Sequence, residues 1–241
     1  MTAGSPKLLV AIATYNEIEN IPSLTAEILA ILPHADILVI DDNSPDGTGK
    51  WVDEHLTTEP RLRVIHRAGK LGLGTATIAG MKYAIEKNYD WLLAMDADFS
   101  HHPRYLQGIL AGMANADVSI GSRYVPGGGV HNWPLKRRLM SRAINIYARW
   151  LLGLRIKDCS GAYRCFRVDL LRKLDFTQII SRGYSFGEEV LWRLKRVGAR
   201  FHESPIIFAD RERGLSKINS QEAYQALWII FRLGLTNWLG I

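Results

Sequence analysis

The stretch KLLVAIATYNE, residues 7–17, places a nearly uninterrupted apolar run directly before a polar motif. Such a run is typical of a strand covered on both faces in a parallel sheet. Shorter apolar runs recur at residues 37–40, 63–65, 91–95 and 118–120, and helical patterns lie between them at residues 20–32, 47–56, 75–88 and 103–115. Strands alternating with helices in this way predict an α/β fold with a mostly parallel sheet and helices on both faces.

The size and charge of the chain narrow the class of protein. Its 241 residues suffice for one substantial α/β domain. A net charge of +6 favours anionic partners such as nucleotides, phosphates or acidic membranes. The basic residues form no dense run with interleaved aromatics, so nucleic acid is not an expected partner.

Two features favour a cytoplasmic location. Cys159 and Cys165 stand six residues apart, and an extended chain would hold their Cα atoms roughly 20 Å apart, too far for a disulfide. The first 13 residues lack the basic start, long apolar core and cleavage site of a signal peptide. Both observations suit a reducing compartment.

Polar motifs follow four of the five predicted strands. TYNE (residues 14–17), DDNSPDGT (41–48), DAD (96–98) and SRY (122–124) each begin where an apolar run ends. In parallel sheets, ligands bind beyond the carboxyl ends of the strands. The sequence therefore predicts one site at this edge of the sheet.

The acids of MDADFSHHP, residues 95–103, have two interpretations. Two carboxylates about 6 Å apart repel by roughly 3 kcal/mol at an effective dielectric of 20, and a cation such as Mg²⁺ or Mn²⁺ would relieve this. Alternatively, Asp98 caps the next helix and Asp96 is solvated. The adjacent His101 and His102 lack the i,i+4 spacing of a zinc pair and are interpreted as turn residues.

Three basic segments could bind phosphate. In KLGLGTAT, residues 70–77, the glycine pattern is broken at Thr77; the glycines permit a tight entry into a helix, and Lys70 could face a phosphate. Arg137, Ser141, Asn145 and Arg149 share one face of a predicted helix at Leu135–Leu152, either as a phosphate site or as a solvated surface. The run DRERGLSK contains Arg211, Arg213 and Lys217. These three cations either lie in a solvated loop or bind a diphosphate.

The second half is less regular. Helices are predicted near Val168–Leu174 and at Phe186–Val197, followed by a strand-like segment at residues 201–211. The final stretch, Ala223–Ile241, is apolar with one arginine and several polar residues, which favours a helix lying in a membrane interface, or packed on the core, over one that spans it.

Taken in order, these motifs resemble those of the inverting nucleotide-sugar transferases with a GT-A (Rossmann-like) fold, glycosyltransferase family two, and among them the dolichyl- or polyprenyl-phosphate mannose synthases. The landmarks are TYNE, DDNSPDGT, MDADFSHHP, GSRY, WPLKRRLMSRAIN, DCSGAYRCF, GYSFGEE and DRERGLSK, between Lys7 and Lys217. The resemblance implies a GT-A domain at residues 1–218 and a C-terminal amphipathic, membrane-associating helix at residues 219–241.

The resemblance also implies residue roles. On the donor side, Tyr15, Glu17, Asp41 and Asp42 would hold the base and ribose, with Lys70 beside them and Ala13 where family members usually carry proline. Asp96 and Asp98, with Ser100, would engage a divalent metal, Mg²⁺ or Mn²⁺, at the diphosphate. Arg211 and Lys217 would close over the diphosphate, and Glu189 would touch the sugar.

On the acceptor side, Arg123, Arg137 and Ser141 would receive the phosphate of the lipid. The implied reaction is transfer of mannose from GDP-mannose to dolichyl or polyprenyl phosphate, with inversion, at the cytoplasmic face of a membrane, where a partner protein can anchor such enzymes. A lipid monophosphate is already ionised near neutral pH, so it needs no strong general base. Three alternatives remain open: glucose or another sugar from a UDP-sugar, a non-catalytic nucleotide or lipid-phosphate binding module, and, more distantly, a dinucleotide oxidoreductase.

Overall fold

The computed structural model describes residues 5–209 and 220–240, with side chains in the last helix described from residue 224 onward. The strands are β1 (Leu8–Thr14), β2 (Asp36–Asp41), β3 (Leu62–His66), β4 (Trp91–Asp96), β5 (Val118–Ser122), β6 (Gly129–His131), β7 (Arg164–Arg167), β8 (Phe201–Pro205) and β9 (Ile207–Ala209). The helices are α1 (Ile21–Ile31), α2 (Thr48–His55), α3 (Leu73–Glu86), α4 (Leu106–Gly112), α5 (Leu135–Leu152), α6 (Val168–Leu171), α7 (Phe186–Arg196) and α8 (Ser220–Leu239), with single 3₁₀ turns at Pro103–Tyr105 and Phe176–Gln178.

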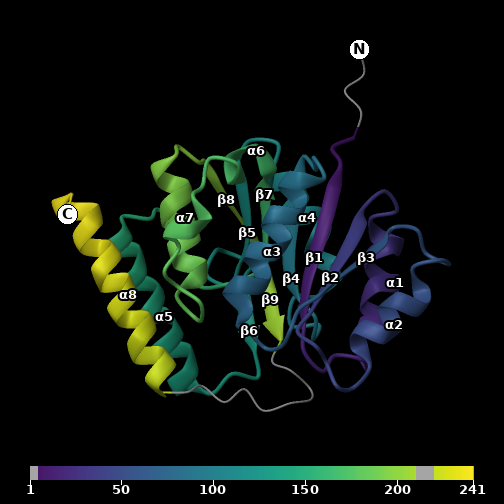
Figure 1. The fold of residues 1–241 in the computed structure, drawn as a ribbon. Helices are drawn as coiled ribbons and strands as arrows, with labels where there is room; N and C mark the ends of the chain where they lie inside the picture. The colour runs from purple at the N-terminus through teal and green to yellow at the C-terminus, as the bar shows by residue number, and fades with distance from the viewer. Residues whose placement is uncertain (1–4, 210–219, 241) are drawn as a thin grey trace.

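The main sheet has seven strands in the order β3-β2-β1-β4-β7-β5-β8 (Figure 1). All neighbours pair in parallel except β7, which is antiparallel to both β4 and β5. The predicted α/β class with a mostly parallel sheet is therefore confirmed, and all five predicted strands of the first half are present.

Strand β1 is buried on both faces, as its apolar run predicted. Leu9 and Ala11 belong to one core cluster, shared with α3 and α7, whereas Val10 and Ile12 belong to the other, shared with α1 and α4. Successive side chains of a strand point to opposite faces, so a strand between two helical layers must be apolar at every position. Each fully buried aliphatic side chain here stabilises the fold by about 1.5–3 kcal/mol.

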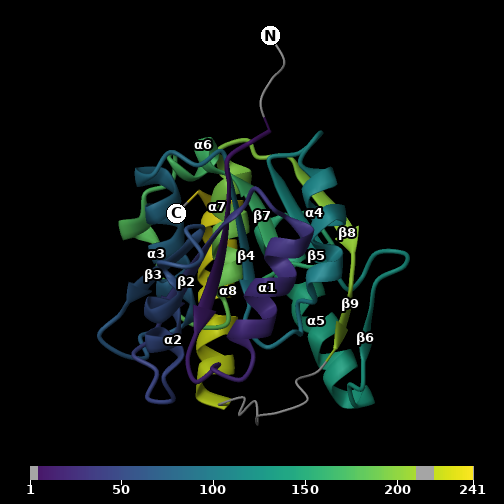
Figure 2. The same ribbon diagram turned by 90° about the vertical axis from the view of Figure 1, so that its right-hand side faces the viewer.

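The strands of the second half differ from the prediction, as two segments illustrate. Residues 164–167, RCFR, form β7, although arginine at both ends hides the apolar pattern. The described part of the strand-like segment predicted at residues 201–211 divides at Ile206. Strand β8 joins the main sheet, and β9 pairs with β6 in a separate two-stranded sheet (Figure 2). In both cases, pairing across the sheet overrides a weak local pattern.

Helices α5 and α8 lie side by side at one end of the molecule (Figure 1). Tyr147 Oη donates to the Leu227 carbonyl at 3.2 Å, and Asn237 Nδ2 donates to the Leu151 carbonyl at 3.3 Å. One face of α8 joins the core cluster through Ile230 and Leu233. In the part of the chain that the structure describes, no helix is both long enough and apolar enough to cross a bilayer.

Candidate active site

The loops after β1 and β2 are bound to each other at the carboxyl edge of the sheet. The backbone N–H groups of Asn16, Glu17 and Ile18 donate to the side chains of Ser44, Thr48 and Asp46, each at 3.0 Å. Asn16 has a φ of 60°, in the left-handed region that asparagine tolerates better than most residues. The polar motifs TYNE and DDNSPDGT thus form one rigid unit.

The two acids that open the second motif are buried and already have partners in the chain. Asp41 accepts hydrogen bonds from the Ser44 N–H at 3.0 Å and from the Thr14 hydroxyl at 3.1 Å. Asp42 lies 2.8 Å from Arg67 Nη1. Burial raises the pKa of Asp42, and the Arg67 guanidinium partly offsets this effect. These contacts shape the loop that was predicted to hold the base and ribose.

Tyr15 and Lys70 lie together above this edge. The Lys70 ammonium stands 4.7 Å from the centre of the exposed Tyr15 ring, within cation–π range. Lys70 also lines a cavity at this edge of the sheet, together with Ala13 and Asp96. The structure therefore brings together four residues predicted for the donor side from three separate motifs.

The loop after β4 is organised by a buried histidine. The Asp96 N–H donates to His101 Nδ1 at 3.0 Å, and the His101 ring stacks on Tyr163 with centroids 4.9 Å apart. Burial lowers the pKa of His101 despite the nearby carboxylates of Asp96 and Asp98, so the imidazole is neutral and accepts at Nδ1. His101 thus belongs to the turn, as predicted, and holds Asp96 in place.

The acid pair has the chemistry of an open Mg²⁺ or Mn²⁺ site. Asp96 is partly exposed at the cavity, and Asp98 Oδ1 accepts from both the N–H and the hydroxyl of Ser100. Within residues 5–209 and 220–240, no group of three or more His, Cys, Asp or Glu side chains is arranged to hold a metal. Two carboxylates suit a hard cation whose remaining ligands are waters and substrate phosphates. The residues present fit such a metal, and they exclude a closed structural cage in this part of the chain.

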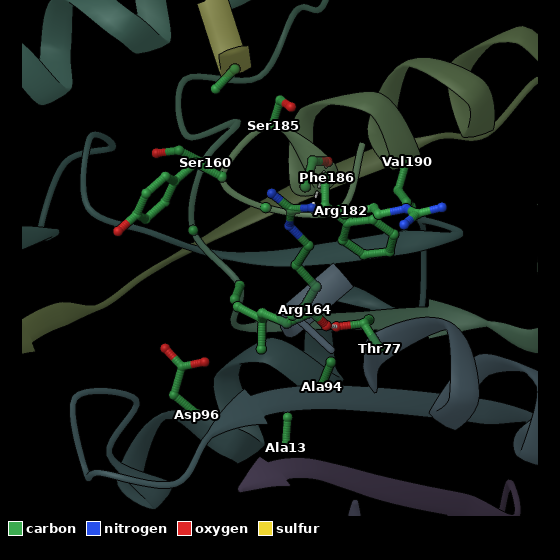
Figure 3. A pocket seen from close by; sticks show the side chains of 18 of the residues that line it. Ala13, Thr77, Ala94, Asp96, Ser160, Arg164, Arg182, Ser185, Phe186 and Val190 are labelled. Atoms are coloured by element: carbon green, nitrogen blue, oxygen red, sulfur yellow. Dashed lines mark hydrogen bonds between the residues drawn. The ribbon is translucent and has the colours of Figure 1, made fainter. Parts of the chain in front are cut away.

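The cavity has a volume of about 870 Å³ and opens between the carboxyl ends of β1 and β4, the segment before α7, and α8 (Figure 3). Its polar lining includes Asp96, Lys70, Ser160, Arg164 and Arg182. Ser160, Arg164 and Arg182 were not predicted from the sequence. Ser160 and Arg164 lie in DCSGAYRCF, whose place in the sheet the sequence did not show. Residues Gln225, Ala226 and Ile229 of α8 complete one wall, so the C-terminal helix forms part of the cavity.

Arg123, predicted for the lipid phosphate, makes a buried ion pair with Asp158. Its Nε and Nη2 each donate to Asp158 at 2.7 Å, and Nη2 also donates to Ser160 at 2.7 Å. Burial alone would raise the pKa of Asp158. The hydrogen bonds and the charge of Arg123 outweigh this effect and hold the pKa of Asp158 below its usual range. Arg123 therefore joins the end of β5 to a residue that lines the cavity.

The predicted polar stripe on α5 faces inward. Arg137, Ser141 and Arg149 are half-buried and Asn145 is buried, so a solvated helix face is ruled out. The Arg137 guanidinium lies 4.1 Å from the Trp133 ring centre, and the Tyr124 hydroxyl donates to Ser141 Oγ at 2.7 Å. Asn145 Nδ2 donates to Ser160 Oγ at 3.1 Å, which links the stripe to the cavity.

Glu189, predicted to touch the sugar, is fully buried on α7. Its carboxylate accepts from the Ser181 N–H at 2.8 Å and from Arg193 Nε at 2.8 Å. These bonds fix the segment before α7, which forms one side of the cavity. Arg211 and Lys217, predicted to close over the diphosphate, lie outside the described residues.

A cavity lined by cations and an acid, at the carboxyl ends of parallel strands, is typical of α/β enzymes that act on phosphorylated ligands. The model of glycosyl transferase family 2 matches residues 9–175. The chain belongs to this family.

Two relatives match almost the whole chain. An undecaprenyl-phosphate mannosyltransferase of Micrococcus luteus is 43% identical over 236 residues, which cover 98% of this chain and 97% of the relative. A polyprenol monophosphomannose synthase of Mycolicibacterium smegmatis is 42% identical over 231 residues, covering 95% and 87%.

Among solved structures, a glucosyl-3-phosphoglycerate synthase from Mycobacterium tuberculosis, in complex with Mn²⁺, UDP and glucosyl-3-phosphoglycerate, has a TM-score of 0.66 at 16% identity. The match covers 97% of this chain and 80% of that one. At this identity the likeness supports the fold, which agrees with the GT-A architecture that the motifs implied.

Proposed function

We propose that the protein transfers mannose from GDP-mannose to a polyprenyl or dolichyl phosphate, with inversion at the anomeric carbon. The observation that carries this proposal is one cavity that connects two sets of cationic and polar side chains suited to bind phosphate. Asp96 and Lys70 lie on its donor side. The inward face of α5, with Arg137 and Ser141, reaches the cavity through Asn145 and Ser160. The two mannosyltransferase relatives support mannose and a polyprenyl phosphate as substrates.

On the donor side, Tyr15 and Lys70 offer a flat ring and a cation at the cavity rim, suited to a base and a phosphate. Glu17 and the loop of Asp41 and Asp42 would contact the ribose, with Ala13 beneath. Because Asp41 and Asp42 already have partners in the chain, we assign them chiefly to the shape of this loop.

A divalent metal, Mg²⁺ or Mn²⁺, would be held by Asp96 and Asp98, with Ser100 supporting Asp98. When bound, it neutralises charge on the diphosphate leaving group. Arg211 and Lys217, carried over from the family motif DRERGLSK, would add two cations on the same diphosphate. Their contribution rests on the sequence alone.

On the acceptor side, Arg137 and Ser141 would hold the lipid phosphate. Arg137 keeps a guanidinium on the inner face of α5, where it can make charge-assisted hydrogen bonds to a phosphate. The Asp158 pair and Ser160 engage Nε and Nη2 of Arg123, so we assign Arg123 to positioning.

The chemistry needs little beyond orientation and charge. The acceptor phosphate is a nucleophile without deprotonation, so a positioned anion and a stabilised leaving group suffice. His101, the histidine nearest the acid pair in sequence, is neutral, buried and already bonded to the Asp96 N–H. We therefore assign it no proton transfer.

The surfaces of α5 and α8 suit a lipid acceptor at a membrane. On α5, exposed Leu135, Leu139, Ile146 and Trp150 share one face with Arg142. On α8, one face exposes Tyr224, Trp228, Phe231, Leu235, Trp238 and Leu239. Aromatic and aliphatic side chains with interspersed cations are typical of helices in the membrane interface. We place the protein peripherally on the cytoplasmic face, with or without an anchoring partner protein.

The proposal is tested by a product assay. The protein is incubated with GDP-mannose, Mg²⁺ or Mn²⁺ and a polyprenyl phosphate, and the lipid fraction is analysed for a mannosylated product. UDP-glucose in parallel reports the donor, and the corresponding polyprenol without phosphate is the acceptor control. Absence of any mannolipid from metal-replete protein that still binds GDP would refute the proposal.

A further inference from the structure

One arginine on the cavity wall retains a hydrogen-bond donor without a partner. Arg164, on β7, is only 3% exposed. Its Nη1 donates to the Gly187 carbonyl at 2.8 Å and its Nη2 to the Cys159 carbonyl at 2.6 Å. Its Nε is buried and makes no hydrogen bond within the described structure. A buried, unpaired donor is costly unless a ligand completes it.

The sheet register places this donor near the predicted diphosphate anchor. Arg164 pairs with Ala94 on the neighbouring strand β4, two residues before Asp96. From strand spacing and rise, the Cα atoms of Arg164 and Asp96 are about 8 Å apart. Figure 3 shows the Arg164 side chain crossing from β7 toward the segment that carries Ser185 and Phe186. Arg164 therefore lines the same cavity as Asp96, and its guanidinium is directed toward the segment before α7.

The environment of Arg164 favours a neutral oxygen over a phosphate. Both Nη atoms are occupied by carbonyl groups, so Arg164 offers one N–H and not the two-pronged contact that suits phosphate. A second buried group, Glu188, stands next to Gly187 in the chain and interacts electrostatically with Arg164. Its carboxyl group partly offsets the guanidinium charge and disfavours an anion at this point.

We propose that Arg164 binds the transferred sugar, its Nε–H donating to an oxygen of the hexosyl group, and thereby contributes to sugar selection. This inference rests on the proposed function, because it takes the ligand of the cavity to be a nucleotide-sugar. A site that donates to one particular sugar oxygen discriminates strongly against donors that lack this oxygen, since the buried donor is then left unpaired.

The guanidinium of Arg164 is closely packed against the start of α7. A Cβ atom on Gly187 would stand 2.9 Å from Arg164 Nη2, so a larger residue there would shift the guanidinium. In an Arg164→Lys variant, an ammonium group keeps a positive charge and N–H donors near the two carbonyl groups. Lysine has a methylene group where Nε stands, so this variant removes the proposed contact and retains the buried charge.

The test compares ligand binding and does not depend on turnover. Dissociation constants are measured by calorimetry for GDP and GDP-mannose, and for UDP and UDP-glucose, in the presence of Mg²⁺. Dividing the dissociation constant of the free nucleotide by that of its nucleotide-sugar gives the factor by which the sugar increases affinity. In Arg164→Lys we expect this ratio to fall about ten- to a hundredfold, with unchanged affinity for the free nucleotide.

The matched control is Arg167→Lys, because Arg167 lies on the same strand but does not line the cavity. Its Nε atom lies 3.3 Å from the Asp117 carboxylate. It should leave both affinities unchanged. An unchanged ratio in Arg164→Lys would overturn the inference, as would an equal loss of affinity for the nucleotide and its conjugate, which indicates a general supporting role. The binding measurement uses both guanosine and uridine nucleotides and requires no transfer. A failed product assay would therefore refute the proposed reaction but would leave the binding test of Arg164 valid.

Discussion

The acids of this protein differ in role because their partners differ. Glu189 is fully engaged by the Ser181 N–H and Arg193, whereas the adjacent Glu188 has an unpartnered buried Oε2. Asp98 is held by Ser100, while Asp96 remains partly exposed at the cavity. At the scale of single residues, contacts made through the fold distinguish a supporting acid from one able to bind a ligand.

The acid after β4 provides the first prediction. Replacing Asp98 with alanine removes one of two proposed metal ligands, so we expect transfer activity to fall by about a hundredfold or more. The metal concentration needed for half-maximal activity should rise in the same variant. Asp53→Ala, at an exposed position on α2, is the control. Undiminished activity in Asp98→Ala would remove the metal assignment.

The unpaired Glu188 predicts a pH-dependent stability. Burial raises the pKa of Glu188 to about 7 from 4.5, and the charge of Arg164 only partly counters this. Between these two pKa values the folded state binds more protons than the unfolded state, so this group lowers stability as the pH rises from 4.5 to 7. The loss is complete above pH 7 and amounts to about 3 kcal/mol.

Glu188→Gln should therefore unfold at a higher denaturant concentration than the wild type at pH 8, and at a similar one at pH 4.5. Glu189→Gln, which weakens satisfied hydrogen bonds, should be destabilising at pH 8. A Glu188→Gln variant that is less stable than the wild type at pH 8 would contradict the argument.

Helices α5 and α8 each carry two different faces. The inward face of α5 holds Arg137, Ser141 and Asn145 near the cavity, and its outward face exposes Trp150, 71% accessible. Helix α8 packs Ile230 and Leu233 into the core and exposes Trp228, 64% accessible. At the scale of elements, the two helices connect the cavity to an apolar surface, which is the arrangement a lipid-linked phosphate requires.

This surface predicts binding to anionic vesicles. Trp150→Ala and Trp228→Ala should each weaken cosedimentation with phosphatidylglycerol vesicles by about tenfold, because each removes a large apolar side chain from the interface. Leu71→Ala, at an exposed apolar residue outside both helices, should leave binding unchanged. Equal effects of all three substitutions would argue against a membrane face formed by α5 and α8.

At the scale of the whole molecule, the cavity depends on segments that are distant in the chain. Ala13, Asp96, Arg164 and Ile229 line it together, from β1, β4, β7 and α8. Because four elements must be in place before the cavity exists, a bound ligand should stabilise the entire folded state.

Nucleotide binding should therefore raise the unfolding temperature. At a concentration one hundred times its dissociation constant, a ligand stabilises by about 2.7 kcal/mol, which for a chain of this size corresponds to about 5–10 °C. We expect GDP with Mg²⁺ to produce this shift, and UDP at equal concentration to produce a smaller one. A larger shift with UDP would replace GDP-mannose by a UDP-sugar as the proposed donor.

Much of the fold and part of the site could be predicted from local pattern. The apolar runs located β1 to β5, and the spacing of Arg137, Ser141 and Asn145 located the inward face of α5. A continuous apolar run and a helical spacing each lie within a single element, and both are therefore visible in a short window of sequence. Strand β7 was missed because its pairing with β4 and β5 has no local signature.

The amino-acid sequence by itself determined the alternating α/β order, the edge of the sheet at which polar motifs gather, and the family. Only the tertiary structure decided that Arg123 pairs with Asp158, that Glu189 supports a loop, and that Arg164 borders the cavity with a free Nε. The physical reason is that burial and hydrogen-bond partners arise from residues far apart in the chain. For charged side chains, those partners determine whether the charge maintains the fold or binds a ligand.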